Sequence, residues 1–204
     1  YKALNFPPPE FAHHALILGK DRAKLSKRHG SVAVREFREK GILPEALVNY
    51  LALLGGSIGE GREVCGIDEI IGSFSLNQAG KSGAIFDEDK LRWMNAIYIR
   101  KDDAGNLADR MLPYLAKAGY DVETMDRNRL ESITDALRDN LVTLSDITSY
   151  MDIFFDDRYQ ITADALKTIE SAESRPVLER LRDILSDSGE EISYQNITDK
   201  IGRA

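Results

Sequence analysis

Apolar residues recur at helical spacing along most of the chain, with short polar stretches between them. This period is typical of helices that bury one face. Gly41 is placed to end one helix, and Pro44 suits the first turn of the next. Ser31 and Asp87 are candidate N-caps. The predicted helices cover residues 31–41, 44–54, 68–74, 87–100, 104–118, 127–142, 145–155, 163–171 and 176–186.

The N-terminal stretch departs from this pattern. Prolines at 7–9 exclude a helix there, and residues 15–18 are predicted to form a short strand that runs into a basic segment. Residues 75–85 are predicted to be a loop. The expected fold class is therefore mainly α, with a first region, residues 1–103, that carries the strand and the basic loop, and a second region, residues 104–204, that is an all-helical bundle.

The charge of the chain is uneven. The formal net charge is −7, yet residues 1–30 contain six Lys and Arg residues against two acidic ones. A contact with a polyanion is therefore expected to be local. The single cysteine, Cys65, cannot form a disulfide within the chain, and no apolar run approaches the roughly 20 residues that span a bilayer. These features predict a cytoplasmic protein that has no membrane partner.

The segment whose composition is most specific is residues 24–30, Lys-Leu-Ser-Lys-Arg-His-Gly. Two lysines three positions apart, with a serine between them and a glycine just after, can place ammonium groups on phosphate oxygens without a bulky side chain in the way. From the spacing alone, an ordinary exposed basic turn is the simpler explanation.

The run resembles the KMSKS signature of class I aminoacyl-tRNA synthetases, in the KLSKR form typical of glutamyl-tRNA synthetases. Other stretches resemble the bacterial members of that family, in the family's order. They are 11–13 (FAH), 16–19 (LILG), 36–38 (EFR), 43–47 (LPEAL), 50–55 (YLALLG), 86–87 (FD) and 90–95 (KLRWMN). The similarity is strong up to Arg100, although residues 20–23 and 82–84 depart from the family's pattern.

The resemblance implies part of an ATP-dependent ligase that activates glutamate as an adenylate and transfers it to a glutamate-accepting tRNA. Lys24 and Lys27 would be catalytic residues on the ATP phosphates, and Ser26 and Arg28 would complete the ATP-binding loop. Mg²⁺ would accompany ATP as its counter-ion, and no protein-bound metal is expected in this segment. By the same resemblance, the first region would contact the tRNA stem, the second would be the first part of a helical anticodon-binding domain, and the ligase would be a monomer.

The resemblance also predicts that the chain is a C-terminal portion of such a ligase. Class I synthetases carry a HIGH-type motif in a nucleotide-binding fold, and His13, His14 and His29 do not occur in that context. The family's last anticodon-reading domain is also expected to be lacking. We therefore expect this segment to be inactive on its own.

Three basic residues of the first region are candidates for weak contacts with the tRNA backbone: Lys81, Arg92 and Arg100. Ordinary solvated side chains explain them as well. In the same helix, Trp93 is predicted to pack in the core, whereas Asn95 and Tyr98 are further candidates for contacts with sugar or phosphate.

Two alternatives stay open. A glutaminyl-tRNA synthetase is disfavoured, because that enzyme would turn to β-barrels where this chain continues with helices. The other alternative is a non-catalytic tRNA-binding or interaction module that has kept the loop as a relic. Individual anticodon contacts, and discrimination between glutamate and glutamine tRNA, do not follow from the sequence.

Overall fold

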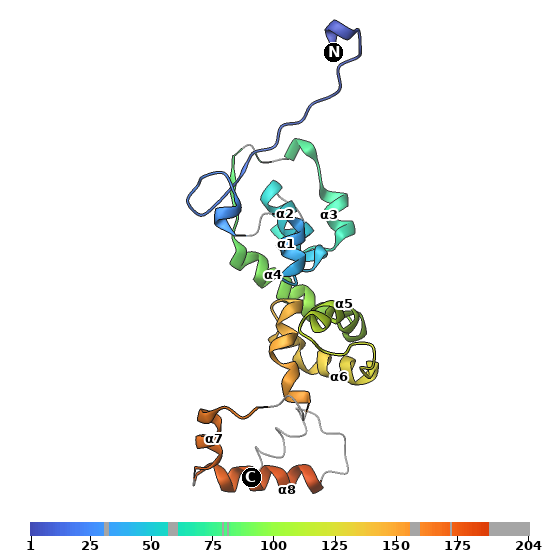
Figure 1. Cartoon of the computed structure of the whole chain (residues 1–204). Helices are drawn as coiled ribbons and strands as arrows, with labels where there is room; N and C mark the ends of the chain where they lie inside the picture. The colour runs from blue at the N-terminus through green and yellow to red at the C-terminus, as the bar shows by residue number, and fades with distance from the viewer. Residues whose placement is uncertain are drawn as a thin grey trace. The chain divides into compact units, whose positions relative to one another are not determined.

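The structure, a computed structural model, describes residues 1–30, 33–56, 61–78, 80, 82–155, 160–171 and 173–187. The chain folds into two compact units, Tyr1–Met151 and Asp152–Ala204. The described residues are mostly helical and include one two-stranded sheet (Figure 1). The predicted mainly α fold class is thereby confirmed. The predicted boundary between residues 103 and 104 lies within the first unit and stays a prediction.

Most elements agree closely with the expected ranges. The exceptions are a second strand in the predicted 75–85 loop, and 3-10 helices in place of the end of the predicted 127–142 helix and of the predicted 145–155 helix. The α-helices are α1 Val34–Glu39, α2 Pro44–Gly55, α3 Ile67–Ser73, α4 Glu88–Lys101, α5 Ala104–Lys117, α6 Arg127–Leu137, α7 Ala163–Ile169 and α8 Ser174–Asp187. The strands are β1 Ile17–Leu18 and β2 Ala84–Ile85. The 3-10 helices are η1 Lys2–Leu4, η2 Lys27–His29, η4 Leu76–Gln78, η5 Arg138–Asn140, η6 Leu144–Ser149 and η7 Met151–Phe154.

Local sequence explains where several helices begin and end. The Asp87 carboxylate caps α4 by accepting hydrogen bonds of 3.0 and 3.2 Å from two backbone N–H groups of the first turn. Pro44 is the first residue of α2, and Gly41, with φ +80°, follows α1. These three predicted signals are confirmed, whereas Ser31, the other predicted N-cap, lies outside the described residues.

The stretch after α6 is more tightly wound than the apolar pattern predicts, because η5, η6 and η7 are 3-10 helices. Asp146 explains the start of η6. Its carboxylate accepts hydrogen bonds from the backbone N–H of Val142 at 3.0 Å and of Thr143 at 2.8 Å. Such side-chain to backbone bonds favour a tight turn over a continuous α-helix.

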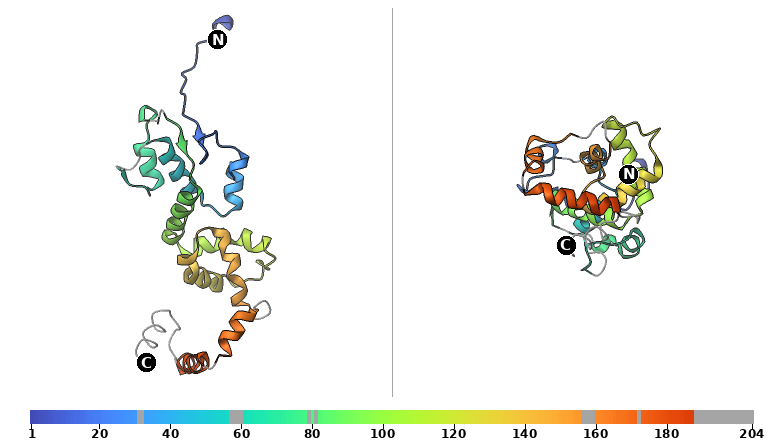
Figure 2. Two further views of the ribbon diagram at one scale, coloured as in Figure 1. Left: turned by 90° about the vertical axis from the view of Figure 1, so that its left-hand side faces the viewer. Right: turned by 90° about the horizontal axis from the view of Figure 1, so that it is seen from below.

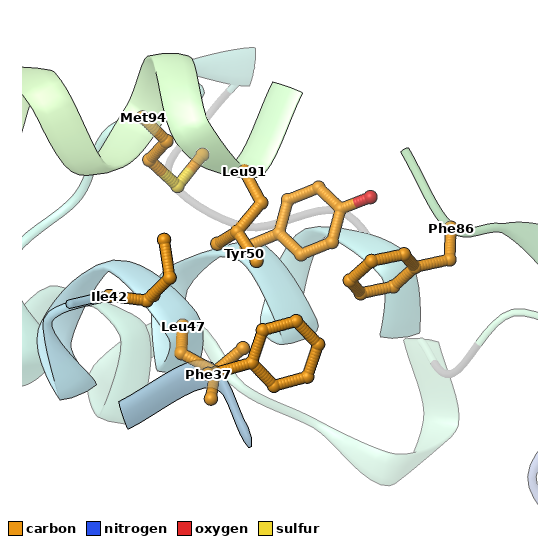
Figure 3. Packing of buried hydrophobic residues seen from close by; sticks show 7 residues of the cluster. All are labelled: Phe37, Ile42, Leu47, Tyr50, Phe86, Leu91 and Met94. Atoms are coloured by element: carbon orange, nitrogen blue, oxygen red, sulfur yellow. The ribbon is translucent and has the colours of Figure 1, made fainter. Parts of the chain in front are cut away.

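One hydrophobic cluster in the core of the first unit joins α1, α2 and α4. Its buried members are Phe37, Ile42, Leu47, Tyr50, Phe86, Leu91 and Met94 (Figure 3). The ring centroid of Phe86 lies 5.6 Å from that of Phe37 and 5.3 Å from that of Tyr50, which it meets edge to face. Such aromatic pairs add about 0.5–1.5 kcal/mol beyond the area that they bury. Phe86 therefore fixes the segment between β2 and α4 to α1 and α2.

A buried amide ties α4 to two loops. Asn95 is fully buried, and its Oδ1 accepts a hydrogen bond from the Leu43 N–H at 2.8 Å. Its Nδ2 donates to the carbonyl oxygens of Val142, at 2.7 Å, and Gly41, at 3.4 Å. One side chain thus pairs with polar backbone groups from a loop that precedes α4 in the chain and from one that follows it. These groups would be costly to bury without a partner.

Gly41 packs directly on η6. Its carbonyl accepts a hydrogen bond of 2.9 Å from the Leu144 N–H. A Cβ atom at position 41 would lie 2.5 Å from the backbone nitrogen of Ser145 and 2.7 Å from that of Leu144. Only a residue without a side chain fits this approach, and the positive φ angle favours glycine as well.

Helix α5 packs against α6 and η6 (Figure 2), and it also contacts the first two α-helices. The Tyr114 hydroxyl donates to the Arg38 carbonyl at 2.6 Å. The Arg110 guanidinium forms a bidentate pair with Glu45, at 2.8 and 3.1 Å, and this hydrogen bonding lowers the pKa of the Glu45 carboxyl. The residues on both sides of position 103 therefore form one packed unit.

In the second unit, α7 and α8 pack against each other. Thr162 caps α7, because its hydroxyl accepts a hydrogen bond of 3.2 Å from the Ala165 N–H.

We predict that Gly41→Ala destabilises the chain more than Gly119→Ala, a matched control. Both glycines have positive φ, +80° and +87°, but a Cβ at position 119 meets nothing within 4 Å. Gly119→Ala should cost about 1–2 kcal/mol of left-handed strain, and Gly41→Ala about 1–3 kcal/mol more for overpacking. Urea unfolding followed by circular dichroism measures both, and equal losses would contradict the packing assigned to Gly41.

Candidate phosphate-binding loop

The small parallel sheet places the basic loop. β1 pairs with β2, so that Ile17 lies opposite Ala84 and Leu18 opposite Ile85. The Leu18 carbonyl also accepts a hydrogen bond of 2.8 Å from the N–H of Phe86. The start of the loop is therefore attached to the segment that leads into α4, where Phe86 is held in the core.

The loop folds back on β1 immediately. The Gly19 N–H donates to the Ala23 carbonyl at 2.8 Å, and the Leu25 N–H donates to the Ile17 carbonyl at 2.9 Å. Lys24 forms an isolated antiparallel bridge with Leu18. The backbone position of Lys24 is thus fixed by hydrogen bonds on both sides of it, although its side chain is exposed.

Residues 20–23, which depart from the family's pattern, form the tight turn that this geometry requires. Arg22 adopts a left-handed φ of +60°. The Asp21 carboxylate accepts a hydrogen bond of 2.9 Å from the Ala23 N–H and another of 3.1 Å from the Arg28 guanidinium. Arg28 therefore spans the loop from η2 back to the turn.

Lys27 is the first residue of η2. Gly30, whose φ angle is +106°, follows η2, and its N–H donates a hydrogen bond of 3.3 Å to the Lys27 carbonyl. The side chains of Lys24 and Lys27 are exposed. Within the part of the chain that the structure describes, neither side chain forms an ion pair. Ser26, between them, is half-buried. Two ammonium groups on one short loop are thus available to an anion such as a polyphosphate.

A pocket of about 460 Å³ separates the loop from the start of α4. Its lining residues are Gly19, Lys20, Leu25, Phe86, Glu88, Asp89 and Arg92. Lys20 pairs with Asp89 at 3.2 Å, and Lys40 pairs with Glu88 at 2.5 Å. The hydrogen bond that Lys20 donates to Asp89, together with the negative charge of Asp89, raises the pKa of Lys20. The acidic first turn of α4 is therefore already paired with cations.

The three residues predicted to contact the tRNA backbone differ in exposure and location. Arg92 is half-buried and lines the pocket, whereas Arg100 is exposed near the end of α4. Arg92 therefore shares a pocket with Leu25 of the basic loop, and Arg100 is not among the residues that line it. Lys81 lies outside the described residues.

Two predictions for other residues of α4 are wrong. Trp93 is 45 % exposed rather than buried, because the fully buried positions Leu91, Met94 and Asn95 define a helix face that excludes position 93. Asn95 cannot reach a ligand, since it is fully buried and bonded internally. The half-buried Tyr98 is also engaged, because its hydroxyl donates to the Cys65 carbonyl at 2.6 Å.

Sequence reasoning missed the part that Glu88 and Asp89 play beside the loop. Their position predicts only a favourable interaction with the helix dipole. Their second role depends on the pairing of β1 with β2, which no local pattern shows. The one signal in the sequence is complementary charge: Glu88 and Asp89 are acidic, whereas the loop is basic.

The described residues contain no group of three or more His, Cys, Asp or Glu side chains that could hold a metal ion. Cys65 is buried, and burial raises the pKa of its thiol. No described helix is both long and apolar enough to cross a membrane.

Comparison with known proteins connects both regions to one group of enzymes. Residues 1–93 match a family model described as the catalytic domain of class I tRNA synthetases (E and Q), and residues 106–203 match one described as an anticodon binding domain. Glutamate–tRNA ligase 2 of Syntrophus aciditrophicus is 57 % identical over 92 % of this chain and 38 % of its own length. The glutamate–tRNA ligase of Aquifex aeolicus is 42 % identical over 94 % of this chain and 41 % of its own length.

A solved structure shares the fold. The crystal structure of a glutamate tRNA ligase from Elizabethkingia meningosepticum, in complex with its amino acid, superimposes with a TM-score of 0.74 and 26 % identity. The superposition covers 100 % of this chain and 43 % of the other. The chain therefore spans about two fifths of the length of the relatives that it matches.

We predict that the loop lysines are dispensable for folding. Lys24→Ala and Lys27→Ala should leave the urea midpoint unchanged, because neither side chain has an ion pair in the described part of the chain. Leu25→Ala should cost about 1–2 kcal/mol, less than the ~2–5 kcal/mol of a fully buried leucine, because Leu25 packs against the core while partly buried. A loss of stability in the lysine variants as large as in Leu25→Ala would show that the lysines are structural.

Proposed function

The chain belongs to the glutamate–tRNA ligase family of class I tRNA synthetases, and on this premise we propose that it forms part of a ligase that joins glutamate to tRNA at the expense of ATP. It supplies the loop that binds the ATP phosphates and helices that bind tRNA. The observation that carries the proposal is the pair of exposed lysines, Lys24 and Lys27, which form no ion pair among the described residues and lie on a loop fixed by backbone hydrogen bonds.

In the proposed first step, a carboxylate oxygen of glutamate attacks the α-phosphorus of ATP and the bond to the bridging oxygen breaks. Pyrophosphate leaves with the electron pair, so negative charge builds on its oxygens. The ammonium groups of Lys27 and Lys24 stabilise this charge more in the transition state than in the ground state. One charge-assisted hydrogen bond contributes about 1.5–3 kcal/mol, equivalent to roughly ten- to a hundredfold in rate.

The other two residues of the predicted ATP-binding set have supporting roles. Ser26 lies between the lysines and shapes the loop. Arg28 is paired with Asp21 at 3.1 Å, and this exposed pair is weak enough for a phosphate to compete with it. Mg²⁺ bound to ATP would neutralise further charge on the phosphates, and no described cluster of acidic side chains offers it a separate protein site.

We propose that tRNA is bound by both regions. The first region, residues 1–103, would contact the tRNA stem, and the match of residues 106–203 to an anticodon binding domain supports an anticodon-binding region from 104 onward. Arg92 and Arg100 on α4 remain candidates for the tRNA backbone. The described residues after position 103 contain no strand, which favours the glutamyl enzyme over a glutaminyl enzyme with β-barrels there.

Three further expectations belong to this proposal. The complete ligase would work in the cytoplasm, as a monomer. The chain alone would not charge tRNA, because it spans about two fifths of its relatives' length. The relic-module alternative predicts that the chain cannot support charging in any context.

A chimaera distinguishes the ligase hypothesis from the relic-module hypothesis. In it, this chain replaces the matching segment of the Syntrophus aciditrophicus ligase. Aminoacylation of glutamate tRNA is measured for the chimaera and, in parallel, for the chain alone. We predict an active chimaera in which Lys27→Ala lowers kcat about ten- to a hundredfold. Lys117→Ala, an exposed lysine in the last turn of α5, serves as the control and should change nothing. An active chimaera indifferent to Lys27→Ala would contradict the phosphate role, and charging by the chain alone would contradict the expected inactivity.

A further inference from the structure

The acidic first turn of α4 lies against both ends of the basic loop. Before the loop lysines, Lys20 pairs with Asp89 at 3.2 Å. After them, a Cβ atom on Gly30 would lie 3.4 Å from Oε2 of Glu88. We propose that Glu88 and Asp89 are positioning residues, which restrain the two ends of the loop so that Lys24 and Lys27 face the ATP phosphates.

The pairing of the surrounding charges supports this role. Glu88 is held by Lys40 at 2.5 Å and Asp89 by Lys20 at 3.2 Å. The two carboxylates therefore have cationic partners of their own, Lys40 at the end of α1 and Lys20 just before the loop lysines. They do not need Lys24 or Lys27 for neutralisation, and these remain available to a polyphosphate.

The topology explains why an acidic turn is found there. The Leu18 carbonyl accepts the N–H of Phe86 at 2.8 Å, and α4 begins at Glu88, two residues after Phe86. The strand pair thus delivers the N-terminus of α4 to the start of the loop. A Cβ at position 30 would be in ordinary van der Waals contact with Glu88, so it is the φ of +106°, rather than the space, that favours glycine there.

The exposure of the two ion pairs sets how strongly removal of the Glu88 and Asp89 charges should affect the loop. Lys20 and Asp89 are largely exposed, with 73 % and 83 % of their side-chain surfaces accessible, whereas Lys40 and Glu88 are 42 % and 32 % accessible. The Lys20–Asp89 pair restrains the start of the loop without locking it, and the Lys40–Glu88 pair holds Glu88 beside Gly30 at the other end. The loss of both carboxylates should therefore weaken the ordering of the loop about three- to tenfold. If the carboxylates acted only by repelling phosphate, their removal would instead strengthen the binding of ATP.

Limited proteolysis tests the restraint on this chain itself. Trypsin can cleave after Lys24, Lys27 and Arg28, and mass spectrometry follows each cut. We expect Glu88→Gln/Asp89→Asn to speed these cuts about three- to tenfold, with an unchanged circular dichroism spectrum. Asp68→Asn, which removes an exposed acidic residue from the first turn of α3, controls for the helix-dipole effect and should leave the cuts unchanged. Equal rates in all variants would overturn the proposal.

A charge swap tests the Lys20–Asp89 pair separately. Asp89→Lys alone should speed the cuts, and Lys20→Asp/Asp89→Lys should restore the slow rate, because the swapped pair can form again. Failure of the swap to restore the rate would remove Asp89 from the proposal and leave the restraint to Glu88 alone.

The functional consequence rests on the proposed ligase and is measured in the chimaera. Glu88→Gln/Asp89→Asn should raise the KM for ATP about three- to tenfold, less than the effect of Lys27→Ala on kcat. An unchanged or lower KM for ATP would overturn the positioning role. The phosphate role of Lys27 would still stand if Lys27→Ala impaired charging in the same assay. If the unmutated chimaera does not charge tRNA, the proposed function fails, while the proteolysis still decides whether the acidic turn restrains the loop.

Discussion

The hydrogen bonds between β1 and β2 join the basic loop to the helical part of the chain. Each strand has only two residues, and a strand pair of this length is not stable by itself. Its stability comes from Phe86, which follows β2 and packs between Phe37 and Tyr50. The Tyr50 hydroxyl also accepts a hydrogen bond of 2.6 Å from the Asp87 N–H. The hydrogen bonds of the loop itself set its shape, and the core of α1, α2 and α4 anchors it through Phe86.

The same core extends beyond the first region. Asn95 and Gly41 bind the α1–α2 turn to the segment before η6, and Arg110 and Tyr114 bind α5 to the first two α-helices. Residues 1–151 consequently form one compact unit, although two family models match on either side of residues 94–105. In the proposed ligase, this continuity would hold the tRNA-binding helices and the phosphate loop in a fixed relation.

The sequence predicts most helix positions, because their signals are local. Asp87, Pro44 and Gly41 act within one turn of the helix that each begins or ends, and the strand at 17–18 follows from a short apolar run. β2 was expected to be loop, because its pairing partner lies more than 60 residues away. The exposure of Trp93 was missed because residue type was given more weight than the helical register set by Leu91, Met94 and Asn95. The candidate loop itself was found from composition and resemblance, whereas its acidic neighbours depend on nonlocal strand pairing.

In the proposed ligase, the loop that is attached to the sheet presents Lys24 and Lys27 to phosphate. The first experiment is a titration of the ¹⁵N-labelled chain with pyrophosphate, the proposed leaving group, followed by amide NMR. We expect saturable shifts that are concentrated at residues 24–30 and are lost in the Lys24→Ala/Lys27→Ala variant. Shifts that are absent from this loop, or that persist without the two lysines, would contradict it.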